Sequence, residues 1–236
     1  MRKQARSSLA LIIPALNEAP VIARTLAAVP KHLFAAVIVA DNGSTDDTAE
    51  TARRAGATVV REPEKGYGAA CLKAIDALPE GVDIVIFMQA DLSEDPAEAA
   101  ALAAPIIDGR ADMVLGSRVL GEAEKGAVLP HQHFGNLIAT TLIRWIYGHR
   151  YSDLGPFRAI RLDALKRLAM RDRNYGWTVE MQVKALQKGL RVMEIPVSYG
   201  LRKAGVNKVS GNWKASLAAG FKILWTLARL AVTSPR

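Results

Sequence analysis

The chain has 236 residues, of which 50% are hydrophobic and 23% are charged. This composition excludes an intrinsically disordered chain and a collagen-like one, and the length suffices for a self-sufficient core. A single cysteine, Cys71, excludes an internal disulfide and a cysteine-based zinc cluster, which favours a reducing, cytoplasmic compartment.

The formal net charge of +8 is distributed unevenly along the chain. Residues 1–118 carry 12 basic and 16 acidic side chains, whereas residues 119–236 carry 19 and 7, so the two halves have formal charges of −4 and +12. The basic half indicates an anionic partner, such as an acidic membrane surface or a phosphorylated substrate. Nucleic acid is disfavoured, because the chain lacks the interleaved aromatic and basic motif of an RNA-binding sheet.

Short apolar, β-branched runs alternate with helical patterns in the first half of the chain. The basic residues before the run at 9–13 resemble a weak signal peptide, but Pro14 interrupts that run, and we interpret it as a first strand. Because the runs are continuously apolar, both faces of the sheet are covered, which predicts an α/β fold with a mainly parallel sheet and helices on both faces. The predicted strands are residues 9–13, 36–40, 57–60, 84–88 and 113–115, and the predicted helices are residues 19–29, 48–55, 69–78 and 97–107.

After Arg118 the pattern changes through a charged, Gly-rich loop. No long polar linker follows, so we expect a single domain over residues 1–236, without any stretch of about 20 apolar residues that could span a membrane. The later predicted elements are helices at residues 136–147, 178–187 and 212–231 and strands at residues 157–160 and 192–199.

The last predicted helix is amphipathic at 100° per residue. Two interpretations stay open: the helix lies on a bilayer through its apolar side, or it packs that side on the core and leaves a basic side in solvent. The basic side holds Lys214, Lys222 and Arg229, and the opposite side holds Leu217, Phe221, Leu224 and Ala228.

Polar residues follow three of the predicted strands, at residues 14–18, 41–46 and 89–91. Ligands of open parallel sheets bind beyond the carboxyl ends of the strands, so Asp41 and Asp91 are predicted to point into one crevice. Capping of the next helix is the alternative role for such residues. The chain has no phosphate-binding Gly-x-x-x-x-Gly-Lys loop, and residues 66–71 lack the third glycine of a dinucleotide fingerprint.

Several of these segments, in the same order along the chain, resemble motifs of the family-two glycosyltransferases with the GT-A fold. The later segments resemble the branch of dolichol-phosphate mannose synthases, which transfer a sugar from a nucleotide to a polyprenyl phosphate. The segments are residues 12–18, 39–48, 90–96, 116–118, 153–158, 177–181 and 202–211.

The resemblance implies a nucleotide-sugar-binding half at residues 1–118 and an acceptor-binding half at residues 119–236. Asp91 would bind a divalent Mg²⁺ or Mn²⁺ ion and the diphosphate of a UDP or GDP sugar. The position of Gln89 is usually an aspartate in the branch, and its neutral amide oxygen predicts a weaker metal site. The implied nucleotide site comprises Pro14, Ala15, Asn17, Glu18, Asp41, Asn42, Gly68 and Ala90.

A phosphate acceptor is already ionised near neutral pH and needs cations rather than a general base. Arg118, Arg202 and Lys208 are therefore the candidate catalytic cations beside Asp91. His133 lies near the position where the branch tends to place an arginine for the lipid phosphate. The implied acceptor site comprises His133, Asn136, Asp153, Arg158 and Glu180.

The sequence thus predicts an inverting glycosyltransferase that moves a hexose or N-acetylhexosamine to a polyprenyl phosphate at the cytoplasmic face of a membrane. One alternative is a transferase of the same fold with a soluble or glycan hydroxyl acceptor, for which Asp153 or Glu180 would be the general base. The other is a non-catalytic protein of this fold that binds membranes or polyanions.

Overall fold

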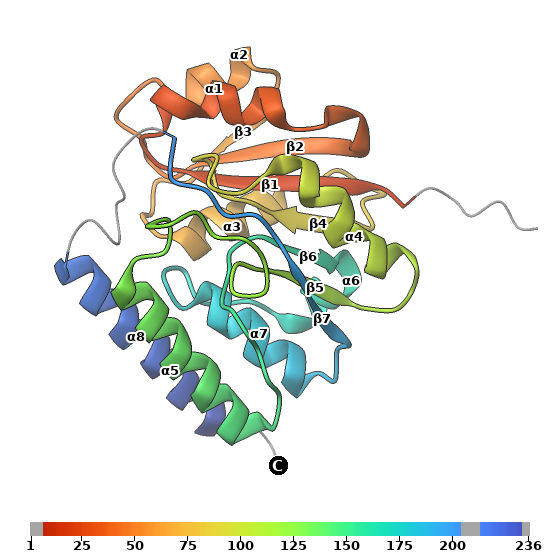
Figure 1. Cartoon of the computed structure of the whole chain (residues 1–236). Helices are drawn as coiled ribbons and strands as arrows, with labels where there is room; N and C mark the ends of the chain where they lie inside the picture. The colour runs from red at the N-terminus through yellow and green to blue at the C-terminus, as the bar shows by residue number, and fades with distance from the viewer. Residues whose placement is uncertain (1–6, 204–212, 233–236) are drawn as a thin grey trace, which may run out of the picture.

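One seven-stranded sheet forms the centre of the molecule in the computed structural model (Figure 1). The structure describes residues 7–203 and 213–232, and in the last helix it describes side chains from residue 220 onward. The strand order is β3-β2-β1-β4-β6-β5-β7, and all neighbours are parallel except β6, which is antiparallel to β4 and β5. The predicted mainly parallel α/β fold is confirmed. The strands are β1 (Leu9–Ala15), β2 (Phe34–Asp41), β3 (Thr58–Arg61), β4 (Ile84–Phe87), β5 (Met113–Ser117), β6 (Arg158–Arg161) and β7 (Val192–Pro196).

Helices cover both faces of the sheet, as the continuously apolar strands require. Leu11 and Ile13 of β1 pack with α1, α2 and α4, while Ala10 and Ile12 pack on the other face with α3, α5, α6, α7 and α8. The helices are α1 (Ala19–Ala28), α2 (Thr48–Arg54), α3 (Tyr67–Asp76), α4 (Ala99–Ile107), α5 (Pro130–Tyr147), α6 (Leu162–Leu168), α7 (Trp177–Gln187) and α8 (Trp213–Val232), with short 3-10 turns η1 (Lys31–Leu33) and η2 (Pro96–Glu98).

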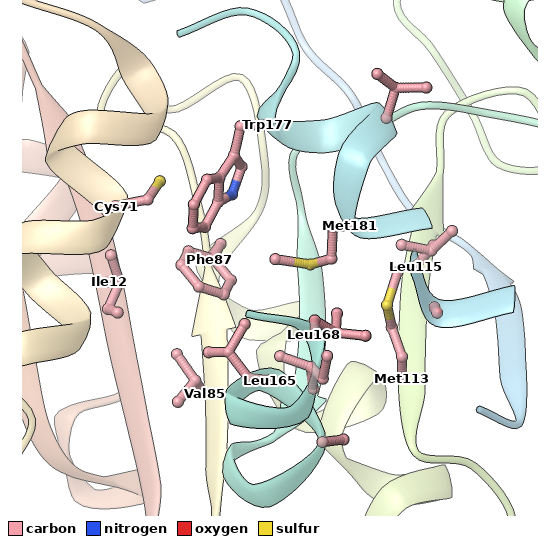
Figure 2. Packing of buried hydrophobic residues seen from close by; sticks show 14 of the residues in the cluster. Ile12, Cys71, Val85, Phe87, Met113, Leu115, Leu165, Leu168, Trp177 and Met181 are labelled. Atoms are coloured by element: carbon pink, nitrogen blue, oxygen red, sulfur yellow. The ribbon is translucent and has the colours of Figure 1, made fainter. Parts of the chain in front are cut away.

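Trp177 lies at the centre of the larger core cluster, next to Phe87 of β4 (Figure 2). The two rings meet edge to face with centroids 6.1 Å apart, a favourable arrangement for an aromatic pair. Cys71 of α3 is buried in the same cluster, where burial raises the pKa of its thiol. Both residues therefore contribute to the core rather than to a cavity wall.

The elements differ from the predicted ones mainly after Arg118. Helix α5 begins at Pro130, six residues before the predicted start, because Pro130 can occupy a first-turn position and Gln132 accepts a hydrogen bond from the Leu129 N–H. Helix α6 is absent from the prediction, since its seven residues offer only two turns of periodicity. Strand β6, predicted as residues 157–160, is inserted between β4 and β5, so a strand from the second half of the chain completes the sheet of the first.

One residue of the predicted basic side of the C-terminal helix α8, Lys222, contacts the protein, while Arg229 of the same side is exposed. Lys222 forms an ion pair with the fully buried Asp172, with 3.1 Å between Nζ and Oδ2, while Leu227 and Leu230 are buried in the core. Phe221 and Leu224 of the predicted apolar side are exposed, Phe221 by 72%. Packing of that side on the core, one of the two interpretations of the sequence, is therefore wrong for these two residues.

Candidate active site

A cavity of about 460 Å³ opens at the carboxyl ends of the central strands. Strand β1 lies between β2 and β4, so the segments after these three strands meet at one edge of the sheet. Of the residues predicted from the sequence, those that line the cavity are Pro14, Ala15, Glu18, Asn42, Gln89, Ala90, Asp91, Arg118 and Arg202.

Asn17, in the loop after β1, and Asp41, at the end of β2, are not among the residues that line the cavity. Asn17 donates its backbone N–H to Ser44 Oγ over 2.9 Å, and its Oδ1 accepts the backbone N–H of Thr45. The Oδ1 of Asp41 accepts the backbone N–H of Ser44 over 3.1 Å. The Asn17 side chain thus joins the loops after β1 and β2, while the Asp41 side chain holds the loop that follows its own strand. These are the structural roles that the sequence left open.

Asn42 holds the segment before α3 against the cavity. Its Nδ2 donates to the carbonyls of Glu62 and Glu64, and its Oδ1 accepts the N–H of Gly66 over 2.7 Å. Lys65, Gly66 and Tyr67 consequently line the cavity beside Asn42.

Gly68 was predicted in the nucleotide site, but it packs against protein main chain and does not line the cavity. A Cβ atom at this position would lie 2.0 Å from the carbonyl oxygen of Asp172. The absence of a side chain at Gly68 therefore allows α3 to contact the segment of residues 172–173. Two lining residues, Asn174 and Tyr175, follow directly after that segment.

Oxygen atoms of three side chains gather after β4. Ser93 Oγ lies 2.5 Å from Asp91 Oδ1 and 3.2 Å from Gln89 Oε1, so carboxylate, hydroxyl and amide oxygens are close together. Such oxygen donors fit Mg²⁺ or Mn²⁺. Over the described residues, no group of three or more His, Cys, Asp or Glu side chains could hold a metal ion. A divalent cation here would thus depend on one carboxylate, Asp91, and on neutral oxygens.

The second carboxyl group of this segment, Glu94, is buried beneath Gln89. Its Oε2 accepts the backbone N–H of Gln89 over 2.7 Å, and its Oε1 has no hydrogen-bond partner among the described residues. Burial raises the pKa of Glu94 to about 8, so the group is mostly protonated at pH 7. Asp91 is therefore the residue that brings negative charge from this segment to the cavity.

Arg202 reaches back into the cavity from the segment after β7. Its Nη1 lies 2.8 Å from Asp91 Oδ2, and its Nη2 forms an ion pair with Glu18 Oε1. Arg202 was predicted as a catalytic cation for an anionic substrate, and here its guanidinium is bound by two carboxylates of the protein. Lys208, the other predicted cation of this segment, lies outside the described residues.

Arg118 links the cavity to a second, smaller one of about 220 Å³ and lines both. Its Nε and Nη2 each donate to Asp153 over 2.7 Å, and its guanidinium carbon lies 5.1 Å from the centre of the Tyr199 ring. Burial is the largest single influence and disfavours the charge, but the hydrogen bonds to Asp153 and the attraction of nearby acidic groups, Asp153 first, together raise the pKa of Arg118. The guanidinium therefore stays positively charged between the two cavities.

The second cavity contains three more of the predicted acceptor residues, namely His133, Asn136 and Asp153. Its other lining residues are mostly apolar or small: Val119, Gly121, Ala123 and Val128. Asn136 is fixed at the wall, because its Nδ2 donates to the carbonyl of Ser152 and its Oδ1 accepts the N–H of Leu154.

Arg158 and Glu180, also predicted to bind the acceptor, line neither cavity. The Arg158 side chain is buried and donates to the carbonyls of Thr178, Leu154 and Gly155. Glu180 is buried in α7, where it accepts the N–H groups of Arg171 and Asp172 and pairs with Lys184 at 2.8 Å. Both predictions are corrected: these charges fix the segments at residues 154–155 and 171–172.

Several lining residues were missing from the predicted site. Lys65, Gly66 and Tyr67 follow β3, so they could have been predicted from the tendency of ligands to bind beyond the carboxyl ends of parallel strands. Leu16 and Ala70 also line the cavity, from the segment after β1 and from α3. Tyr175 lines it too, and its aromatic side chain is a sequence signal for a wall of the sugar or lipid site. Gln132, Asn174 and Tyr199 have no such signal, because they come from segments remote in sequence that only the fold brings together.

Comparisons with known proteins agree with this fold and sequence pattern. A polyprenol monophosphomannose synthase of Mycolicibacterium smegmatis is 28% identical over 223 residues, which cover 86% of this chain and 81% of that protein. The fold is also similar to a crystal structure of glucosyl-3-phosphoglycerate synthase from Mycobacterium tuberculosis in complex with Mn²⁺, uridine diphosphate and phosphoglyceric acid. The two structures superpose with a TM-score of 0.77 at 22% sequence identity, and the match covers 98% of this chain and 80% of that one.

An uncharacterized glycosyltransferase of Mycobacterium tuberculosis is 36% identical over 219 residues, covering 91% of this chain and 95% of that protein. The model of the family described as glycosyl transferase family 2 matches residues 10–169. The chain, with its GT-A-type sheet and its cavity at the carboxyl ends of the strands, therefore belongs to glycosyl transferase family 2 and is a glycosyltransferase.

Proposed function

We propose that the protein transfers a hexose or N-acetylhexosamine from a UDP or GDP sugar to a polyprenyl phosphate, with inversion at the anomeric carbon. The larger cavity would hold the donor, and the smaller one would hold the acceptor phosphate. Arg118, which lines both, is the observation that carries the proposal, since it offers one positive charge to both anionic substrates.

The donor half of the proposal rests on Asp91, Gln89 and Ser93. These residues would hold Mg²⁺ or Mn²⁺, which stabilises the charge that develops on the departing nucleoside diphosphate. The Mn²⁺ and uridine diphosphate in the solved glucosyl-3-phosphoglycerate synthase agree with this assignment. Asn42 and the backbone around Pro14 and Ala15 would form the wall against which the nucleoside lies.

The state of the carboxylates favours a phosphate acceptor over a hydroxyl one. In the described part of the chain, three carboxylates line the two cavities: Glu18 and Asp91 pair with Arg202, and Asp153 pairs with Arg118. A hydroxyl acceptor would need one of them as a general base, whereas each of them already binds an arginine in an ion pair. A phosphate oxygen is already ionised and can attack the anomeric carbon in a single inverting step.

The surroundings of the smaller cavity favour a lipid as the carrier of that phosphate. Arg118 and His133 lie among the apolar Val119, Ala123 and Val128. Val119 and the next residue, Leu120, are themselves exposed. A phosphate bound to the cations would therefore find apolar surface for the first units of an isoprenoid chain.

The acceptor class is tested by incubating the full chain with Mn²⁺, labelled UDP or GDP sugars and a polyprenyl phosphate in detergent, followed by extraction into butanol. We expect label in the organic phase with the polyprenyl phosphate and none with the same polyprenol lacking the phosphate. Label that remains in water, and appears there only when 3-phosphoglycerate replaces the lipid, would support a soluble phosphorylated acceptor instead. Equal transfer to the phosphate-free polyprenol would contradict the argument from the paired carboxylates.

Two helices of the second half would bring the enzyme to a membrane. Helices α5 and α8 pack side by side (Figure 1), and neither contains an acidic residue. Each has an exposed apolar stripe at helical spacing, with Trp145 exposed by 77%. The stripes consist of Phe134, Leu137 and Trp145 on α5 and of Phe221, Leu224, Trp225 and Val232 on α8.

This surface, which we call the α5/α8 surface, has the composition of an interfacial membrane contact: apolar and aromatic side chains with basic but no acidic neighbours. No helix among the described residues has the length and hydropathy to cross a bilayer. We therefore include peripheral attachment to an anionic membrane in the proposal.

Replacing Phe221 and Trp225 by serine tests this attachment. Burial of one such side chain contributes about 1.5–3 kcal/mol, so the double variant should bind phosphatidylglycerol vesicles at least about 100-fold more weakly in a sedimentation assay. Its unfolding temperature should not fall, because both side chains are exposed. Ile107→Ser, at an exposed residue of α4, is the matched control and should bind as the wild type does. Equal vesicle binding by all three proteins would contradict the role of the α5/α8 surface.

A further inference from the structure

Arg202 occupies the point where the acidic groups of the cavity converge. Its two terminal nitrogens bind carboxylates that are 111 and 184 residues away in the sequence, Asp91 and Glu18. The backbone holds the same segment in place: Gly200 N–H donates to the carbonyl of Ser93 over 2.7 Å, and Lys203 N–H donates to the carbonyl of Asp91. The guanidinium is thus docked on the residues after β4.

The two carboxylates need a cation in this position. Glu18 and Asp91 are both 6% exposed, and a buried carboxylate is destabilising unless a cation or hydrogen-bond donors compensate its charge. Arg202 supplies one positive charge to the pair, with donors whose planar fork matches two acceptors. Before any substrate binds, the arginine therefore offsets part of the negative charge of the cavity wall.

The carboxylate of Asp91 that binds Arg202 is also the charged ligand that a divalent cation would use. Its Oδ1 accepts hydrogen bonds from Ser93 and its Oδ2 accepts one from Arg202 Nη1, so a cation on either oxygen would lie close to the guanidinium. A divalent cation on this carboxylate would lie within a few ångström of the guanidinium, and the repulsion between their like charges favours exchange of one for the other.

We propose that Arg202 is the resident counterion of the metal site and that a divalent cation exchanges with it on Asp91. This inference rests on the proposed function only in taking Mg²⁺ or Mn²⁺ as the incoming cation. The exchange would release a guanidinium beside the cavity at the moment when the anionic diphosphate enters with the metal. The segment after β7 would in this way change its partner from protein carboxylates to substrate oxygens.

Competition predicts that removal of the arginine strengthens metal binding. We expect Arg202→Ala, in the full chain without nucleotide, to bind Mn²⁺ at least about tenfold more tightly than the wild type in isothermal titration. Arg202→Lys, which keeps a charge but not the planar fork, should give an intermediate affinity. Arg191→Ala is the matched control, since Arg191 also binds a carboxylate, Asp112, through two side-chain bonds but lines neither cavity.

Thermal unfolding gives a second readout that does not depend on activity. Without metal, Arg202→Ala should unfold at a lower temperature than the wild type, and Mn²⁺ should raise its unfolding temperature by a larger increment. If the alanine variant does not fold without metal, the lysine variant still decides the question through its Mn²⁺ affinity.

Equal or weaker Mn²⁺ binding by the Arg202 variants would overturn the exchange. That outcome is separate from the failure of the proposed function, because the titration contains neither sugar nor lipid. Tighter Mn²⁺ binding together with no transfer to polyprenyl phosphate would retain the exchange and reject the acceptor.

Discussion

Asp91→Ala should reduce the rate of sugar transfer by at least about 10³-fold. Asp91 supplies the one ionised carboxylate that the segment after β4 brings to the cavity, since Asp95 does not line it, Glu94 has a pKa of about 8 and Gln89 is neutral. Without it, no charged ligand of that segment would hold the cation that stabilises the departing diphosphate, an effect of several kcal/mol. Initial rates with each nucleotide sugar over a range of Mn²⁺ concentrations measure the loss.

The matched control for Asp91→Ala is Asp95→Ala in the same segment. Asp95 is exposed, does not line the cavity and accepts the N–H of Ala97 at the start of η2. Its replacement should lower stability by about 1 kcal/mol and leave the transfer rate unchanged. Wild-type rates in Asp91→Ala at saturating donor would show that the charge is stabilised elsewhere.

Gly68→Ala should lower the free energy of unfolding by about 3 kcal/mol. A Cβ atom there would lie 2.0 Å from the carbonyl oxygen of Asp172 and 2.9 Å from the carbonyl carbon of Arg173, so α3 and this main chain must separate. For a chain of this length the unfolding temperature should fall by about 6–12 °C. Differential scanning calorimetry measures both quantities.

Gly135→Ala in α5 is the control, because no atom lies within 4 Å of its added Cβ. Its stability should be unchanged or rise by up to about 1 kcal/mol, since alanine favours a helix over glycine. If Gly68 instead contacted the nucleotide directly, as the sequence suggested, Gly68→Ala would weaken nucleotide binding without a loss of stability. The two variants together therefore distinguish a packing role from a binding role.

The first half of the fold was predictable because its signals are local. The strands that became β1 to β5 were recognised from short continuous apolar runs, and the mainly parallel sheet follows from their burial on both faces. The position of β6 in the sheet was not predictable, because it depends on contacts between segments that are distant in the sequence. The paired residues of β6 and β4 are 71–77 positions apart, and those of β6 and β5 are 43–47 positions apart.

Among the polar and charged residues, too, a position after a strand was predictable from nearby sequence, whereas the binding partner of a side chain was not. Asp91 and Gln89 were located by their place after a strand, and both line the cavity. Arg158 and Glu180 have the residue types of a binding site, yet their partners lie within the protein: main-chain groups for both and the Lys184 side chain for Glu180. A charge in a sequence does not reveal whether its partner will be a substrate or the chain itself.

By itself, the sequence determined the α/β class of the fold, the family resemblance and the edge of the sheet at which the site lies. These depend on hydrophobic runs and short motifs, whose information lies within a few residues. Only the tertiary structure decided that Arg202 binds Glu18 and Asp91, that Gly68 packs on Asp172 and that Phe221 faces outward. The reason is physical: a buried charge, a close main-chain contact and an exposed apolar side chain are each defined by neighbours that folding brings from distant parts of the chain.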